Sequence, residues 1–109
     1  MKEAVRLGTY TPDSRVYNRL PELDILFHEL NAALNDVMNE ITEDDYDPDP
    51  NNQGANPPFW EFRWRSDRFR QIVYLKFRLV SSRPKCMLYS LHPDDYPGRP
   101  LKKENNEVL

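Results

Sequence analysis

The sequence contains very few of the residues on which most cofactor, metal and catalytic sites depend. It holds one cysteine, two histidines and three glycines in 109 residues. The glycines lie far apart, so neither a phosphate-binding loop nor a dinucleotide-binding motif can be built. Two histidines and one cysteine cannot supply a zinc site, and no third group is positioned to complete a cysteine-based triad. We therefore expect no metal and no cofactor, and a non-enzymatic role is favoured.

The sequence also predicts neither an internal disulfide nor a membrane helix. Cys86 is the single cysteine, so no internal disulfide can form, and we expect a buried free thiol in a reducing compartment. The first ten residues, MKEAVRLGTY, lack the apolar run of a signal peptide. No stretch approaches the roughly 18 apolar residues that a membrane helix needs. We expect a cytoplasmic protein with no membrane partner.

The length of the chain suits one small domain with a single core. We expect this domain to span residues 1–92, with an acidic loop rich in proline and asparagine at residues 43–58. Residues 93–109 contain three prolines, one glycine and few apolar side chains, which predicts a flexible C-terminal tail.

One long amphipathic helix is predicted over residues 21–41. Apolar side chains recur there at spacings of three and four, which places them on a single helix face. Pro21 suits the first turn, where its missing N–H costs nothing. Acidic residues gather after Glu40, where the negative end of the helix dipole disfavours them, so this end is expected to fray.

The apolar period changes to two from Phe59 onward, which predicts an antiparallel hairpin. A turn at Ser66-Asp67 pairs Trp64 with Phe69 and puts the apolar residues of both strands on one face. A further strand is predicted over residues 85–91, with two open registers: one buries Met87, Tyr89 and Leu91, and the other buries Cys86 and Leu88. A short strand is also expected within residues 4–10.

The predicted fold is therefore α+β: one long helix packed on a small antiparallel sheet of three to four strands, followed by the flexible tail. An exposed strand edge would be compatible with a homodimer.

The face of the hairpin opposite to the apolar one is expected to be basic. The predicted register places Arg63 across from Arg70 and Arg65 across from Arg68, and Lys76 and Arg78 continue the row. Like charges opposed across strands destabilise the pair, so an anion is expected over this face unless solvent alone covers it. The anion could be phosphate, carboxylates of a partner, or the acidic segment of the chain itself. Aromatic residues such as Tyr74 lie among the arginines, as in surfaces that hold single-stranded nucleic acid.

The acidic segment starting at Glu43 places five carboxylates in seven positions. Counted from Asp45, the segment begins like an EF-hand calcium loop, but its sixth position is Pro50, where the turn of such a loop requires glycine. Asn56 stands where a bidentate glutamate is required. A calcium site is therefore not predicted.

Charge is unevenly distributed along the chain. Residues 1–60 carry a net charge of −8 and residues 61–109 carry +5. Such segregation favours electrostatic partners, although the two halves could also neutralise each other within the molecule.

We expect a small non-enzymatic inhibitor, of the immunity or phage anti-defence kind, that occludes a basic or nucleic-acid-binding surface of a protein such as a nuclease. Carboxylates can imitate a phosphate backbone in such a role. The residues expected to bind the partner are Glu43, Asp44, Asp45, Asp47, Asp49, Arg63, Arg70 and Tyr74.

The segment WEFRWRSDRFRQIVYLKF, residues 60–77, resembles the central strands of RelE/ParE-type toxins. In these toxins a basic aromatic strand turns back through a Tyr-Arg-hydrophobic-hydrophobic-Tyr pattern, which residues 69–74 approximate with Gln71 as an extra residue. The resemblance implies an alternative function, a ribosome-dependent mRNA-cleaving toxin. It also implies that Arg63 and Arg70 neutralise phosphate and that Tyr89 or His92 acts as acid or base. Direct binding of nucleic acid belongs to this alternative.

Overall fold

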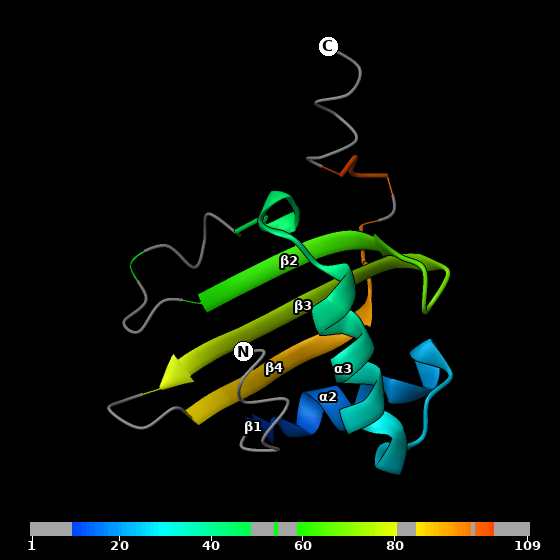
Figure 1. Ribbon diagram of the computed structural model, residues 1–109, viewed down its shortest axis with the longest axis vertical. Coiled ribbons are helices and arrows are strands. Elements are labelled where there is room, and N and C mark those ends of the chain that lie inside the picture. The colour runs from blue at the N-terminus through cyan, green and yellow to red at the C-terminus, as the bar shows by residue number, and fades with distance from the viewer. Residues whose placement is uncertain (1–9, 49–53, 55–58, 81–84, 97, 102–109) are drawn as a thin grey trace.

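The computed structural model describes residues 10–48, 54, 59–80, 85–96 and 98–101. These residues form two α-helices, four strands and three short 3-10 helices (Figure 1). The elements in chain order are β1 (Tyr10–Pro12), α2 (Ser14–Arg19), 3-10 helices at Leu20–Leu23 and Phe27–Glu29, α3 (Leu30–Glu40), a 3-10 helix at Glu43–Asp45, β2 (Phe59–Ser66), β3 (Gln71–Val80) and β4 (Lys85–Pro93).

The four strands form one mixed sheet in the order β1-β4-β3-β2. β2, β3 and β4 are successive antiparallel neighbours, whereas β1 runs parallel to β4, with Tyr10 opposite Cys86. The α+β class and the small sheet are confirmed, but the prediction of an antiparallel sheet was wrong. The helical segments between β1 and β2 return the chain across one face of the sheet, and α3 lies in front of it in Figure 1.

The prediction of one long helix over residues 21–41 was also wrong. The first helical segment starts at Ser14, where the Asp13 carboxylate accepts a hydrogen bond from the Arg15 N–H at 3.0 Å. It ends at Asp24, which has a left-handed φ of 56°. Leu26 is extended, and its N–H donates to the Glu29 carboxylate at 2.7 Å before the helical chain resumes.

The apolar pattern continues through this break, which explains why periodicity did not reveal it. The core residues contributed by the helical segments are Val16, Leu20, Leu23, Ile25, Leu30, Ala33, Leu34, Val37 and Met38. The sheet contributes Trp64, Val73, Leu75, Phe77, Cys86, Leu88 and Leu91. Burying each large apolar side chain of this kind stabilises the fold by about 1.5–3 kcal/mol.

The hairpin has a different register from the predicted one. Asp67 to Arg70 form a four-residue turn, and Trp64 pairs with Val73 instead of Phe69. The shift is an even number of residues, so the apolar side chains keep the same face and alternation could not distinguish the two registers. As a consequence Arg63 lies opposite Tyr74, not opposite Arg70. The predicted pairs of opposed arginines do not exist.

β4 follows each of the two registers that the sequence left open over a different part of its length, because its pairing with β3 is irregular at Lys76/Phe77. Before this irregularity, Cys86 and Leu88 face the core, and after it Leu91 does so. A bulge leaves one residue unpaired and changes the direction of the side chains that follow. Ser90 and His92 consequently reach the face opposite to the helices, where they lie across from Lys76 and Tyr74.

The chain after β4 contacts the body of the domain through Asp94, Asp95, Arg99 and Leu101. The Asp94 N–H donates to the Ile72 carbonyl at 2.9 Å, and Asp95 forms an ion pair with Arg19 at 2.6 Å. Leu101 is buried. The expected boundary between domain and tail stays a prediction, since residues 102–109 lie outside the described residues, as do residues 4–9 of the expected N-terminal strand.

Candidate functional site

Arg63 is the centre of an ionic cluster on the sheet face that the helices leave uncovered. Its side chain is 2% exposed. One guanidinium nitrogen lies 3.0 Å from Asp47 and another lies 2.6 Å from Asp94. The second nitrogen also donates to the Arg99 carbonyl at 3.0 Å, while the Arg99 guanidinium binds Asp47 at 2.8 Å. The cluster therefore joins the acidic segment, β2 and the chain after β4.

Burial alone would lower the pKa of Arg63, but the hydrogen bonds from Arg63 to Asp94 and Asp47 outweigh it and raise the pKa. The guanidinium stays charged and its charge is neutralised inside the protein. Paired and hydrogen-bonded in this way, a buried arginine is tolerated, whereas an unpaired one would cost several kcal/mol. The Arg63 guanidinium is therefore already paired with carboxylates of its own chain.

A polar pocket of about 260 Å³ lies beside this cluster. It is lined by Asp47, Arg63, Tyr74, Lys76, Ser90, His92, Asp94, Asp95, Tyr96 and Arg99. Tyr74 donates a hydrogen bond of 2.5 Å to the buried Glu61, and the His92 ring lies 5.3 Å from the Tyr74 ring. The carboxylates and cations of the pocket are largely paired with each other, so it presents little net charge to a ligand.

The acidic segment divides into inward and outward carboxylates. Asp45 is buried and accepts hydrogen bonds from the N–H and the hydroxyl of Thr42, at 2.8 and 3.3 Å. Asp47 reaches Arg63 and Arg99. Glu43 and Asp44 are exposed, and their side chains have no partner in the described part of the chain. Two carboxylates thus hold the segment in place and two face solvent.

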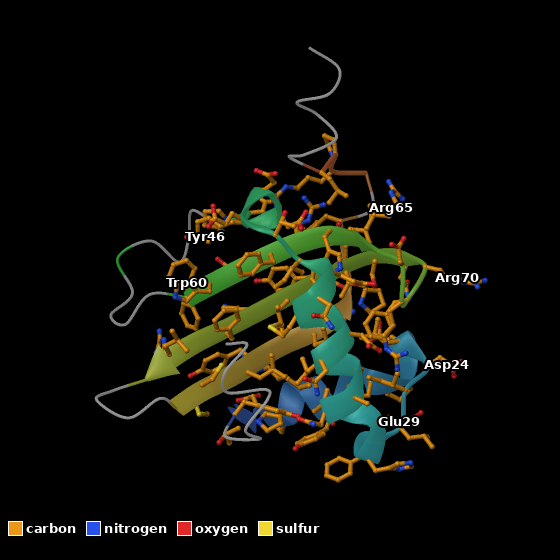
Figure 2. The ribbon with its side chains drawn as sticks, in the orientation of Figure 1. Asp24, Glu29, Tyr46, Trp60, Arg65 and Arg70 are labelled. Carbon is orange, nitrogen blue, oxygen red and sulfur yellow. The ribbon has the colours of Figure 1, made fainter. Side chains whose placement is uncertain are left out.

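An apolar groove of about 510 Å³ lies between the acidic segment and the start of β2. It is lined by Ile41, Thr42, Glu43, Tyr46, Trp60 and Phe62. The Tyr46 ring lies 5.5 Å from the Trp60 ring and 5.7 Å from the Phe62 ring. Figure 2 shows Tyr46 and Trp60 close together at one end of β2 and Arg70 at the other end of the hairpin.

The structure brings together some of the predicted site residues and separates others. Asp47, Arg63 and Tyr74 meet at the polar pocket. Glu43 lines the groove, with Asp44 next in the chain. Arg70 is exposed in the hairpin turn, away from both. Asp49 lies outside the described residues.

Sequence reasoning missed Asp94, Arg99 and Trp60 as members of these sites. Asp94 and Arg99 belong to a segment whose composition is typical of a tail, and only tertiary contacts reveal their role. Trp60 was placed on the core face, but the residue is 40% exposed, because it lies at the start of the edge strand β2, where α3 does not cover the sheet in Figure 1. The sequence signal that could have identified Trp60 as a site residue was its position at the start of the strand that follows the acidic segment.

Cys86 is fully buried in the core, and burial raises the pKa of its thiol. It therefore has the properties of a packing residue. None of the helices in the described part of the chain has the length and hydropathy of a membrane span. Within the same residues, no group of three or more histidine, cysteine or acidic side chains is arranged to hold a metal ion.

Comparison with known proteins returned no matching family model, no matching curated protein and no matching solved structure.

Proposed function

We propose that the protein is a small non-enzymatic inhibitor that binds a partner protein and occludes a basic or nucleic-acid-binding surface on it. The observation that carries the proposal is the outward pair of carboxylates. Glu43 and Asp44 lie on a turn fixed by other acidic residues of the same segment. A fixed turn loses little conformational freedom on binding, so more of the attraction appears as affinity.

Electrostatic attraction would act mainly on the rate of encounter. Charges at the rim of an interface steer a complementary partner and raise the association rate, and salt screens this effect. Asp45 and Asp47 contribute to this binding indirectly, because they orient the segment and do not themselves face the partner.

The toxin alternative gains less support from the geometry. It implies that Arg63 and Arg70 neutralise phosphate. Arg63 is already paired with two carboxylates, and Arg70 lies in the hairpin turn. With these carboxylates in place, the polar pocket has little net positive charge to attract an RNA backbone. Ser90, His92 and Tyr74 do share that pocket, so a direct activity test is still worthwhile.

The experiment uses the full chain as bait in its native cell extract. We expect one stoichiometric partner whose binding weakens steeply as salt rises. The Glu43→Gln/Asp44→Asn variant should weaken binding, whereas the control Asp24→Asn/Asp67→Asn, which removes the same charge at exposed positions elsewhere, should not.

A purified translation system provides the opposing test. If the protein cleaves mRNA on ribosomes and Arg63→Ala or Arg70→Ala abolishes the cleavage, the inhibitor proposal is wrong. Binding of the partner with no response to salt or to the loss of Glu43 and Asp44 would also overturn it.

A further inference from the structure

The groove between the acidic segment and β2 combines apolar walls with an acidic rim. Ile41 and the rings of Tyr46, Trp60 and Phe62 form the walls, and Glu43 forms part of the rim. Its volume of about 510 Å³ is within the usual range of sites that enclose a ligand or a side chain. It is therefore large enough to accept one bulky apolar side chain with its neighbours.

The aromatic residues that line the groove are partly exposed. Trp60 is 40% exposed, and Tyr46 and Phe62 are half-buried. Tryptophan and tyrosine dominate binding energy at protein interfaces because they bury large area with few rotatable bonds. The Trp60 indole N–H also has no partner in the described part of the chain, so it can donate to a partner's carbonyl.

The charge at the rim restricts the chemistry of the occupant. Glu43 lines the groove and Asp44 lies next to it, both exposed. The nearby carboxylates of Asp45 and Asp47 are held by Thr42 and by arginines, so they do not compete for the occupant's charge. A segment with basic residues beside an apolar one would satisfy both the rim and the walls.

The backbone of β2 is already partly covered at this point. Tyr46 forms an isolated bridge with Phe62, and the Asp47 N–H donates to the Glu61 carbonyl at 2.9 Å. A partner strand cannot add to the sheet edge there without displacing these contacts. Recognition at the groove therefore depends on side chains.

From these features we infer that the groove is the docking site for the partner protein, and that its occupant is a segment with a bulky apolar side chain flanked by arginine or lysine. The inference rests on the proposed function and adds the chemistry of the recognised segment to it. The acidic rim steers the basic residues, and the aromatic walls bury the apolar one.

The test is a titration of the full chain, followed by nuclear magnetic resonance. The probe is an acetylated pentapeptide with leucine between two arginines and glycine at each end. Trp60 and Trp64 are the two tryptophans of the chain, and the buried Trp64 donates its indole N–H to Glu40 at 2.8 Å. We expect the Trp60 indole signal to shift with saturable, millimolar affinity while the Trp64 signal stays in place.

Matched peptides and variants make the result specific. Replacing leucine by glycine, or the arginines by glutamates, should abolish the shift. Glu43→Gln/Asp44→Asn should weaken binding about fivefold, and Asp24→Asn/Asp67→Asn should not. Absence of a Trp60 shift at saturating peptide, or equal shifts with the glutamate peptide, would overturn the inference.

Failure of the inference can be told apart from failure of the function. If the peptide does not bind, yet the native partner still responds to salt and to Glu43→Gln/Asp44→Asn but not to Trp60→Ala, the groove is not the docking site and the inhibitor proposal stands. Leu79→Ala, at another partly exposed apolar strand residue, is the control for Trp60→Ala. If the native partner responds to none of these changes, the function itself is wrong.

Discussion

Glu40 shows how one carboxylate can stabilise two elements at once. It lies in the last turn of α3, where the helix dipole disfavours a negative charge. Its side chain accepts hydrogen bonds from the Trp64 indole at 2.8 Å, the Ser66 hydroxyl at 2.7 Å and the Arg68 N–H at 2.6 Å. These donors outweigh the dipole, so the helix is tied to the hairpin at the point where fraying was expected.

Glu40→Gln should lower the free energy of unfolding at neutral pH by about 1–3 kcal/mol, because charge-assisted hydrogen bonds to buried donors are weakened. Burial alone would raise the pKa of Glu40, but the hydrogen bonds from Trp64, Ser66 and the backbone outweigh it and lower the pKa. Folding therefore favours the carboxylate. Its contribution is fully present above the usual pKa of a glutamate and is lost as the pH falls through the lowered value.

Urea denaturation from neutral to acidic pH measures this effect. The difference in unfolding free energy between the wild type and Glu40→Gln should shrink as the pH falls through that window. A difference that is constant with pH would show that the loss comes from packing and not from the charge.

At the scale of an element, the turn between β2 and β3 is built around a strained residue. Arg70 has a left-handed φ of 57°, and its N–H donates to the Ser66 carbonyl at 2.8 Å. The Ser66 hydroxyl accepts from the Phe69 N–H at 3.1 Å. A side chain in the left-handed region costs about 1–2 kcal/mol, which the other turn contacts must offset.

Arg70→Gly should therefore raise the free energy of unfolding by about 0.5–1 kcal/mol, since relief of this strain exceeds the added freedom of the unfolded chain. Arg68→Gly is the matched control in the same turn. It should be destabilising, because Arg68 has no left-handed φ and forms an ion pair with Asp36 at 3.2 Å. Both are measured by chemical denaturation, and equal losses for the two variants would contradict this account of the turn.

The elements also show what could be predicted from the sequence. Alternation identified β2 and β3 and their core face because burial acts on every second residue. It could not fix the register, since a shift of four residues preserves the faces and Glu40, which is remote in sequence, helps to hold the observed turn. The helix break at Asp24 carries no glycine or proline signal, and the pairing of β1 with β4 depends on residues far apart in the chain.

The partner-binding role of the candidate site residues stays a prediction, but the structure shows where charge patterning located them and where tertiary contacts were needed. The acidic segment was identified from composition, and the sequence left open whether it would meet arginines of its own sheet. Asp47 does so, while Glu43 and Asp44 face outward, because Thr42 holds the turn and because Asp47 contacts Arg99 and, through Arg63, Asp94. Composition classed those last residues as tail.

For the molecule as a whole, the opposite charges of the two halves partly neutralise each other. Asp47 from the acidic half pairs with Arg63 and Arg99 from the basic half. Asp94 supplies the second carboxylate to Arg63 from within the basic half. Glu43 and Asp44 stay exposed and take no part in this neutralisation within the described residues.

The two kinds of carboxylate should respond differently to neutralisation. Glu43→Gln/Asp44→Asn should change the free energy of unfolding by less than about 0.5 kcal/mol, because neither side chain has a partner in the described structure. Asp45→Asn/Asp47→Asn should lower it by about 2–4 kcal/mol, because buried donors and Arg63 lose charged partners. Urea denaturation compares the two, and equal effects would refute the division into inward and outward residues.

The contacts of Arg63 and of β1 also constrain when the protein can fold during its synthesis. Arg63 needs the carboxylate of Asp94 and the carbonyl of Arg99, and Tyr10 needs a strand that ends at Pro93. Chains emerge from the ribosome N-terminus first, so Asp94 emerges 31 residues after Arg63. Until then the arginine would have to be buried with only one of its two carboxylates, at a cost of several kcal/mol. The sheet is therefore completed only after the residues up to Pro93 have emerged, and a pause in translation before that point would leave β2 and its apolar face without these contacts.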